Sequence, residues 1–474
     1  MMKIVLIALN EWRALTLSRA FLILGGLVLV LTAYTIVAGA MQYKQVHAHR
    51  EEARGFMRQK FLGQGEVNPH SAAHYGHFVF KPHAFLHVFD PGVEKYVGTT
   101  LRLEGHRQNE AAFATSQSQS SLVRFGELAF VLLLQVIFPL LIIFTCHRAV
   151  VDERASGTLK LLQSQGITMR QLLWGKIFGY TLVYLLLLLV CVVLFLLVIR
   201  FISVEPQGAG WQLLLLPGIY GIYYFILIML TVYLSAWART AGAVLVNMLG
   251  IWFLFTVIVP KAAANIGEQL APLPSKLAVD SWIQEANRNG IDGHDPKNKR
   301  VEELKEALLT KYGVEDLKAL PVNADGVIMQ EDEEYHNMVY DRSFGALQDT
   351  IRRQNSIGSL AAVAAPFLAI RNLSMAVAQT DVYHHFHFLQ EAENYRRHLI
   401  KQLNDEHAYG GSRTGDWDWK VSASYWQGIE DFTYQPPGIS WALSQRMPEL
   451  MALGIWVLGL LLLIQFTSPK IPVL

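Results

Sequence analysis

The segment VVDERASGTLKLLQSQGITMRQLL, Val150–Leu173, decides the fold, because it is a polar break between two long apolar runs. The runs, Leu122–Cys146 and Leu172–Val198, are each long enough to cross a bilayer as a helix. Between them, Thr158 can cap a short helix that holds several leucines, and Gly166 can end it. The pattern predicts a short, rigid, partly apolar helix that lies flat at a membrane surface between two spans.

The composition is that of a membrane protein. Of the 474 residues, 52% are hydrophobic and 17% are charged, and the apolar residues are gathered in runs. The formal net charge of +1 gives no electrostatic reason to expect nucleic-acid binding. Both cysteines, Cys146 and Cys191, fall within apolar runs, so no disulfide framework is available to the polar segments.

Six apolar runs predict a mainly α polytopic membrane protein with six transmembrane helices. The runs are Ala20–Met41, Leu122–Cys146, Leu172–Val198, Leu213–Leu234, Ala241–Val259 and Leu450–Phe466. An apolar stripe along Lys3–Ser18 predicts an N-terminal interfacial helix before the first span. Two alternatives stay open, namely an extension of the first span into the cytoplasm and a signal peptide cleaved near Ala38-Gly39-Ala40.

Six spans place both termini on the same side of the membrane. The short loops on that side are rich in positive charge, as in Arg154, Lys160 and Arg170, which predicts that both termini are cytoplasmic. Two large polar segments, residues 42–121 and 261–448, then both lie outside. We expect them to be α+β, with turns and short strands in the first and mostly helices in the second.

Three helices are expected in the second polar segment, at Lys297–Tyr312, Gln330–Gln354 and Asp381–Asn404. A further apolar stretch, Ile357–Ala378, contains Pro366 and Arg371, and an arginine at mid-membrane costs about 2.5–3.5 kcal/mol on insertion scales. We therefore expect a broken helix at the membrane surface or buried in the outer domain, with a seventh span as the alternative.

The segment ERASGTLKLLQSQGITMRQLLWGK resembles the segment between the second and third spans of ABC-2-type transporter permeases. In that family this segment is the coupling helix, which sits in a groove of the ATPase subunit. The matching residues are Glu153, Arg154, Gly157, Thr158, Leu159, Leu162, Gly175 and Lys176. The resemblance implies that the first six of these couple the chain to an ATPase; the alternative is an ordinary cytoplasmic loop with a capped helix.

The polar segments also resemble part of this family. The motifs NPHSAAHYG, FKP, DPGV, LEGHRQNEA and TDVYHHFHFLQEAENYRR look like those of a bacterial subgroup with two large periplasmic inserts. The layout that follows is residues 1–41 (interfacial helix and first span), 42–121 (first periplasmic insert), 122–260 (spans two to five, with a cytoplasmic coupling helix at 150–170), 261–448 (second periplasmic insert) and 449–474 (sixth span and cytoplasmic tail).

The resemblance implies the permease subunit of an ATP-driven ABC exporter in the bacterial inner membrane. Two permease chains, identical or related, would pair with two ATPase chains. The sequence contains no GxxxxGK[ST], HExxH or GxSxG motif, so we expect ATP to bind the partner subunit and this chain to have no catalytic residue and no cofactor of its own. Ionisable residues are scarce at mid-span, which also favours a drive from outside the membrane.

Histidines are plentiful in the polar segments and raise the question of a metal. On a helix, His384, His387 and Glu391 share a face at spacings that could hold an ion, although packing between the outer domains explains them as well. The alternative function is a membrane-anchored periplasmic binding or chaperone module with a histidine-rich metal or peptide site. Deeper in the spans, Gln135 and Asn247 are expected to form interhelical hydrogen bonds.

Overall fold

The computed structural model describes residues 2–114, 129–202 and 210–472. Within these ranges, six helices are long and apolar enough to cross a membrane, as the sequence predicts. They are Arg19–Leu62, Phe130–Ala155, Met169–Phe201, Gln212–Trp237, Ala241–Leu270 and Met447–Lys470. Residues 122–128 of the predicted second span lie outside the described residues. The protein is therefore a mainly α, multi-pass membrane protein.

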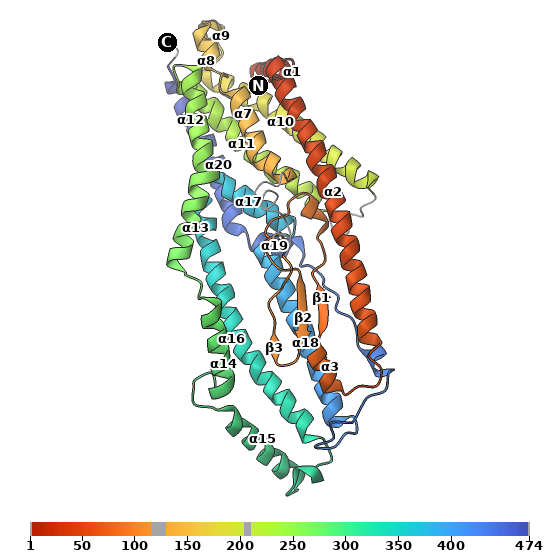
Figure 1. Ribbon diagram of the computed structural model, residues 1–474. Coiled ribbons are helices and arrows are strands. Elements are labelled where there is room, and N and C mark those ends of the chain that lie inside the picture. The colour runs from red at the N-terminus through yellow and green to blue at the C-terminus, as the bar shows by residue number, and fades with distance from the viewer. Residues whose placement is uncertain (1, 115–128, 203–209, 473–474) are drawn as a thin grey trace.

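The membrane region is built from consecutive helices of the chain. In order they are α1 (Met2–Thr16), α2 (Arg19–Leu62), α6 (Phe130–Leu132), η2 (Leu133–Ile137), α7 (Phe138–Cys146), α8 (Val151–Ala155), α9 (Thr158–Ser164), α10 (Met169–Phe201), α11 (Gln212–Trp237), α12 (Ala241–Phe253), η3 (Leu254–Ile258), α13 (Val259–Leu270), α20 (Met447–Thr467) and η6 (Ser468–Lys470). Both chain ends lie with α8 and α9 at one end of the molecule, hereafter the α9 end (Figure 1).

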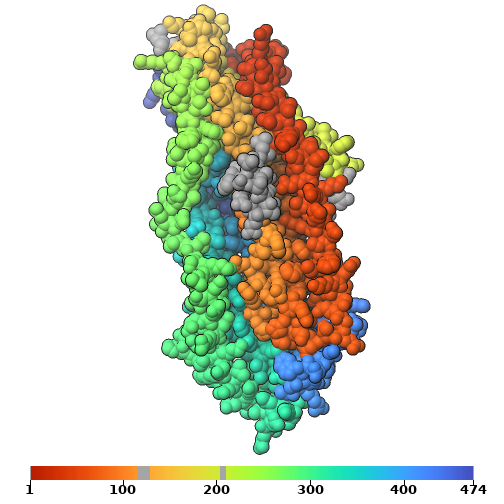
Figure 2. Space-filling model, viewed as in Figure 1, coloured from red at the N-terminus to blue at the C-terminus, as the bar shows by residue number. Residues whose placement is uncertain are grey.

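The opposite end, hereafter the sheet end, carries the strands and most of the polar helices (Figure 1). The first polar segment forms α3 (Pro69–Tyr75), β1 (His77–Phe80), η1 (Phe85–Val88), β2 (Thr100–Glu104) and β3 (Arg107–Gln108), and the strands pair antiparallel in the order β1-β2-β3. The second forms α14 (Lys276–Asn289), α15 (Lys297–Tyr312), η4 (Leu317–Ala319), α16 (Ala324–Ala361), α17 (Pro366–Val377), α18 (Val382–Tyr409), η5 (Tyr425–Gly428) and α19 (Ile439–Ser444). Figure 2 shows the first segment, in orange, wedged between α2 and the green second segment.

Helix α1 is separate from the first span, as predicted for an interfacial helix. The chain breaks at Ser18, whose hydroxyl accepts a hydrogen bond from the Phe21 amide and caps α2. Helix α2 then continues to Leu62, well past the predicted end of the span at Met41, and its 44 residues extend over about 66 Å at 1.5 Å per residue. The added turns are rich in good helix formers and interrupted only by Gly55, so nothing local stops the helix.

The apolar stretch Ile357–Ala378 is a broken helix, as predicted. Helix α16 ends at Ala361, and α17 begins at Pro366, whose missing N–H is harmless at a helix start. Helix α17 is not one of the candidate spans. It is almost entirely buried and shares one apolar core with the spanning helices, through residues such as Ile370 and Leu373. It therefore packs between other helices and is not exposed on the outside of the molecule.

Two spans contain a π-helical turn just before a proline. The turns are η2 and η3, and Pro139 and Pro260 follow them by two residues. A proline inside a helix cannot donate the usual hydrogen bond to the residue four positions earlier, and the helix widens locally to accommodate it. The wide turn of η2 turns Gln135 inward, where it is buried.

Candidate coupling site

The short helices α8 and α9 occupy the loop that the sequence singles out, at the tip of the α9 end (Figure 1). The predicted cap by Thr158 is wrong: Thr158 is the first helical residue of α9, and its hydroxyl lies 2.8 Å from that of Ser156. Gly157 stands before it with φ +74°, a left-handed conformation that favours glycine. That single residue turns the chain from α8 directly into α9.

The end of α9 is formed as predicted. The Ile167 amide donates to the Leu162 carbonyl at 3.1 Å around Gly166, which has φ +74°, the arrangement of a Schellman motif. The capping box at the start of α10 is also present, with reciprocal hydrogen bonds between Thr168 and Gln171 of 3.0 and 3.3 Å. The turn from α9 into α10 is therefore capped on both sides.

The loop is fastened to the end of α11 from two directions. The Ser235 hydroxyl accepts hydrogen bonds from the amides of Val150 and Val151, at 3.0 and 3.3 Å. The Arg154 guanidinium donates to the Ala238 carbonyl at 2.7 Å and to the Ala236 carbonyl, which are left unpaired where a helix ends. It also donates to the Pro472 carbonyl near the C-terminus at 3.1 Å. Helix α8 therefore cannot move without the end of α11.

A buried ion-pair cluster joins α8 to two further helices. Lys176 of α10 is 2% exposed, and its ammonium contacts a Glu153 carboxylate oxygen of α8 at 2.9 Å and the carboxylate of Glu11 of α1. We call Lys176, Glu11 and Glu153 the Lys176 cluster. The sequence pattern contains Lys176 and Glu153, whereas Glu11 carries no local signal because it lies 165 positions from its partner.

Helix α1 approaches α10 at two glycines. A Cβ atom added at Gly175 would come within 2.6 Å of the Ile7 side chain, and one at Gly179 within 2.7 Å of the Ala8 carbonyl oxygen. Gly175 is one of the residues that carry the family resemblance. Its structural role is to let α1 lie directly on α10, which brings Glu11 to Lys176.

The two faces of α9 differ. Leu159 is buried and Leu162 packs on the membrane core, whereas the Leu161 side chain is 64% exposed and Lys160 is exposed beside it. A groove of about 420 Å³ separates α9 from α1, with Leu162 on its α9 side. Of the six predicted coupling residues, Leu159 and Leu162 thus hold α9 on the core, and its exposed face is built from their neighbours.

Comparison with protein families identifies the membrane region. Residues 104–266 match the family model described as "ABC-2 family transporter protein", and these residues include α8, α9 and α10. The chain is an ABC-2-type permease. Residues 277–435 match a second model, described only as a domain of unknown function, DUF3526. A search of curated proteins finds no significant match to the chain.

An ABC-2-type permease is the transmembrane subunit of a transporter, and its family implies an ABC ATPase as partner. The α8–α9 loop lies within the matched residues and projects at one end of this permease. It is therefore the candidate contact for that partner.

The predicted metal ligands of α18 do not converge. His384 is buried, and its Nδ1 lies 2.6 Å from an Asp381 carboxylate oxygen. The Nδ1 atom of His387 lies 3.2 Å from the Tyr434 hydroxyl instead. Among the described residues, the three groups of possible ligands whose donor atoms lie close together do not include this set.

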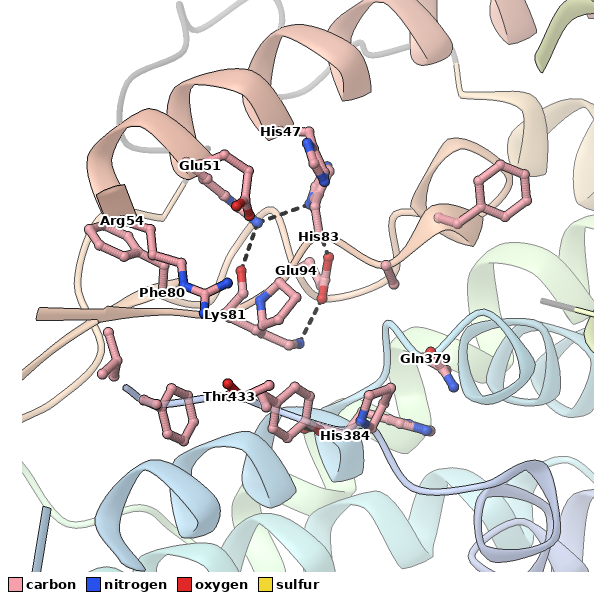
Figure 3. Close-up of a pocket in the computed structure, with 18 of the residues that line it drawn as sticks. His47, Glu51, Arg54, Phe80, Lys81, His83, Glu94, Gln379, His384 and Thr433 are labelled. Carbon is pink, nitrogen blue, oxygen red and sulfur yellow. Dashed lines mark hydrogen bonds and ion pairs between the residues drawn. The ribbon is translucent and has the colours of Figure 1, made fainter. Parts of the chain in front are cut away.

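A cavity of about 390 Å³ lies between α2, β1 and the start of α18, and its walls are charged (Figure 3). Its buried Glu94 contacts the Lys81 ammonium at 2.6 Å and the His87 ring at 2.9 Å. Burial alone would raise the pKa of Glu94, but Lys81 and His87 outweigh it and hold the pKa well below its usual range. Arg50 of α2 donates to the Lys81 carbonyl and lies against the His83 ring, both at 3.1 Å, so it ties α2 to the first polar segment.

A second buried cluster fastens the sheet end to the sixth span. Arg446, just before α20, contacts Asp381 at 2.6 Å and Glu449 at 3.4 Å, and we call these three residues the Arg446 cluster. Glu449 also accepts hydrogen bonds from Ser359 of α16 and Asn372 of α17, at 2.6 and 2.9 Å. Burial alone would raise the pKa of Asp381, but His384 and Arg446 hold it well below its usual range.

Of the two polar residues predicted to bond between spans, Gln135 does so. Its amide donates to the Tyr220 hydroxyl of α11 at 3.0 Å, and Tyr220 donates to Ser374 of α17 at 3.0 Å. Ser374 in turn donates to Asp90 at 2.5 Å, so a chain of hydrogen bonds runs from the second span to the first polar segment. Asn247 is exposed on α12.

Proposed function

We propose that this chain is the permease subunit of an ATP-driven exporter of the bacterial inner membrane, and that α8 and α9 receive the movement of the ATPase. Two permease chains, identical or related, pair with two ATPase chains. The α9 end is cytoplasmic, and the sheet end lies in the periplasm. ATP binds the partner, and this chain contributes no catalytic residue.

The observation that carries the proposal is the position of α8 at a junction of three other helices. The Lys176 cluster ties it to α1 and α10, and Arg154 ties it to α11. A movement of the ATPase reaches the spans only if the helix that it contacts is held rigidly to them. Binding energy, in turn, shifts a conformational equilibrium only through contacts that differ between the states. A displacement of α9 therefore reaches one interfacial helix and two spans directly.

The exposed face of α9 provides the first test. We expect Leu161→Glu to weaken co-purification of the ATPase subunit at least tenfold, because it places a charge where a buried apolar contact is proposed. Leu277→Glu is the matched control, since Leu277 is 77% exposed at the sheet end. Equal co-purification with both variants and the unaltered chain would refute the contact.

Labelling in intact cells tests the sidedness. Ser156→Cys at the α9 end should react with a membrane-impermeant maleimide only after the inner membrane is opened. Ser424→Cys, exposed at the sheet end, should react in cells whose outer membrane alone is permeabilised. The native Cys146 and Cys191 are buried, so the background is low. Reaction of Ser156→Cys from the periplasm would place α9 beyond the reach of any ATPase.

A further inference from the structure

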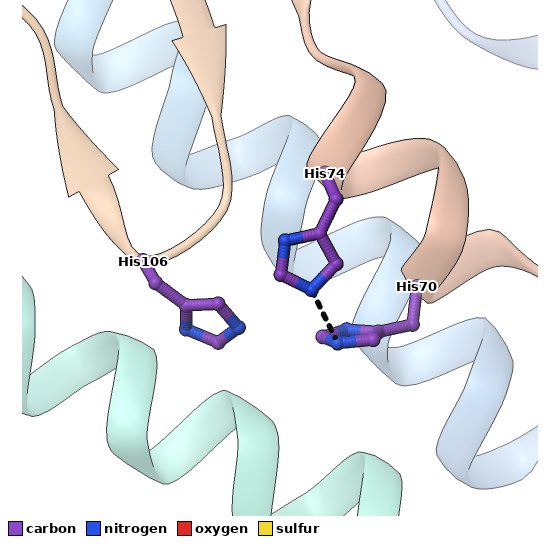
Figure 4. Close-up of side chains that lie close together, drawn as sticks. All are labelled: His70, His74 and His106. Atoms are coloured by element: carbon purple, nitrogen blue, oxygen red, sulfur yellow. Dashed lines mark hydrogen bonds between the residues drawn. The ribbon is translucent and has the colours of Figure 1, made fainter.

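Three histidine rings meet at the sheet end, away from the predicted metal ligands. His70 and His74 lie one turn apart on α3, and His106 lies in the turn between β2 and β3. Figure 4 shows the three rings facing a common space, with one ring nitrogen of His106 directed toward the other two rings. One donor atom from each residue lies within 4.8 Å of the other two. We call these residues the three-histidine cluster.

The spacing of two of the rings is close to that of ligands on one ion. The Nε2 atoms of His70 and His74 are 2.9 Å apart. Two nitrogens bound tetrahedrally to zinc at 2.0–2.1 Å lie about 3.3 Å apart, so only a small shift is needed to bind one. An i,i+4 pair on a helix is also a common way to present two imidazoles to a metal.

The neighbouring helix α18 orients one of the rings. The Nδ1 atom of His70 lies within hydrogen-bonding distance, 3.3 Å, of the Asn404 side-chain oxygen. The His106 ring lies 3.2 Å from a Glu333 carboxylate oxygen of α16, as a charge contact without a hydrogen bond. An oxygen partner at Nδ1 fixes the ring and leaves Nε2 as the donor to a metal, the usual arrangement around metal-binding histidines.

His106 occupies an unfavourable backbone conformation. Its φ is +60°, in the left-handed region that most side chains avoid, and its amide donates to Glu333 at 2.6 Å. Strained residues of this kind persist where the surrounding structure holds them, and they are concentrated at functional sites. In this conformation the His106 imidazole faces the other two rings (Figure 4).

We propose that the three-histidine cluster binds a divalent transition-metal ion of the Zn²⁺ type, with His70, His74 and His106 as ligands and a fourth position open to water. Three imidazoles and an open position are a common zinc environment. The site does not depend on the transport function proposed above. Because α3 and the β2–β3 turn contact α18 and α16 through Asn404 and Glu333, a bound ion would stiffen the packing of the two polar segments.

The other groups of close ligands are less suited to an ion. In the group His83, His87 and Glu94, the carboxylate is already paired with the Lys81 ammonium at 2.6 Å. In the group His106, Asp332 and His336, the Asp332 carboxylate contacts Lys297 at 2.8 Å. A lysine beside the carboxylate competes with a cation for it. The three-histidine cluster contains no carboxylate to be occupied in this way.

Metal binding to the full-length chain tests the proposal. The detergent-purified protein is stripped with a chelator and titrated with Zn²⁺ by calorimetry, and with Co²⁺ by visible absorption, which reports tetrahedral coordination. We expect one Zn²⁺ per chain with micromolar or tighter affinity. His74→Ala should weaken it at least tenfold, and because His74 is exposed, the variant removes no core packing.

Two further variants make the result decisive. His106→Asn removes an imidazole but keeps a residue type that tolerates positive φ, so it should weaken binding while the chain stays folded. His49→Ala removes an exposed histidine of α2 outside the cluster and should bind as the unaltered chain does. The proposal fails if the unaltered chain binds no Zn²⁺, or if His74→Ala and His106→Asn both bind as tightly as His49→Ala.

Discussion

Two junctions of this permease are each held by a buried cation between two carboxylates, and the two clusters differ in how far water reaches them. In the Lys176 cluster at the α9 end, the Glu153 side chain is 23% exposed. In the Arg446 cluster, where the sheet end joins the sixth span, the Asp381 and Glu449 side chains are 1% and 0% exposed. The Lys176 cluster is therefore partly exposed to solvent, and the Arg446 cluster is fully buried.

This difference in exposure indicates which junction can change during a transport cycle. Separating an ion pair is less costly when one partner can be hydrated, and very costly when both are buried. Glu153 sits on a five-residue helix and can reach water if α8 moves. Asp381 and Glu449 stand at the starts of the long helices α18 and α20, and both side chains are buried there. We therefore expect the Lys176 cluster to act in coupling and the Arg446 cluster to hold the fold.

The largest effect is expected from Arg446→Leu. It leaves two buried carboxylates without their cation, which costs about 3–5 kcal/mol of folding free energy. Thermal unfolding can be followed with a thiol-reactive dye, because Cys146 and Cys191 are buried and become reactive only on unfolding. An Arg446→Leu chain that expresses and melts like the unaltered one would show that the sheet end does not depend on this cluster.

Lys176→Met should destabilise the chain less than Arg446→Leu and impair coupling more. Glu153 can turn to solvent when its cation is lost, so only one buried carboxylate, Glu11 with its side chain 10% exposed, is left without a cation instead of two. We expect stimulated ATPase activity of the reconstituted complex to fall at least tenfold, with the partner still bound. The single variant Glu153→Gln separates charge from packing, since it keeps the shape of the side chain. Normal stimulation in both variants would contradict a coupling role for this cluster.

The close approach of α1 to α10 predicts a smaller effect for Gly179→Ala. The new Cβ would stand 2.7 Å from the Ala8 carbonyl oxygen, and overpacking of this kind costs about 1–3 kcal/mol. Gly218→Ala on α11 is the matched control, because a Cβ there meets nothing within 4 Å. The melting temperature should fall only for Gly179→Ala. Equal melting of the two variants would mean that α1 shifts freely on α10.

Much of this architecture could be predicted from the sequence, because it is local. Apolar runs predict the spans, Pro296 and Gly313 bound a helix at Lys297–Tyr312 as observed, and Gly166 ends α9. Each of these signals is contained in one or two helical turns. The predicted Thr158 cap was wrong for an equally local reason. Gly157 takes a left-handed conformation and stands at the cap position, so Thr158 is already the first residue of the helix.

What the sequence could not predict depends on contacts between distant residues. Glu11 pairs with a lysine 165 positions away, and Arg446 joins Asp381 across 65 positions. His106 meets His70 and His74 only because a hairpin and a short helix fold against α16 and α18. The spacing on α18 instead favoured His384, His387 and Glu391, since a helical pattern shows which residues share a face and not what lies opposite.

The smallest effect is expected at the surface beside the Lys176 cluster. Arg148 and Asp152 lie 3.8 Å apart with side chains 65% and 55% exposed, and exposed pairs of this kind contribute about 0.2–0.5 kcal/mol. Arg148→Gln should therefore leave the melting temperature of the isolated chain almost unchanged, and added salt should remove any remaining difference. A clear loss of stability that salt does not change would mean that exposed residues at the α9 end contribute substantially to folding. The contrast between a hydrated junction and a sealed one would then no longer explain which of the two can move.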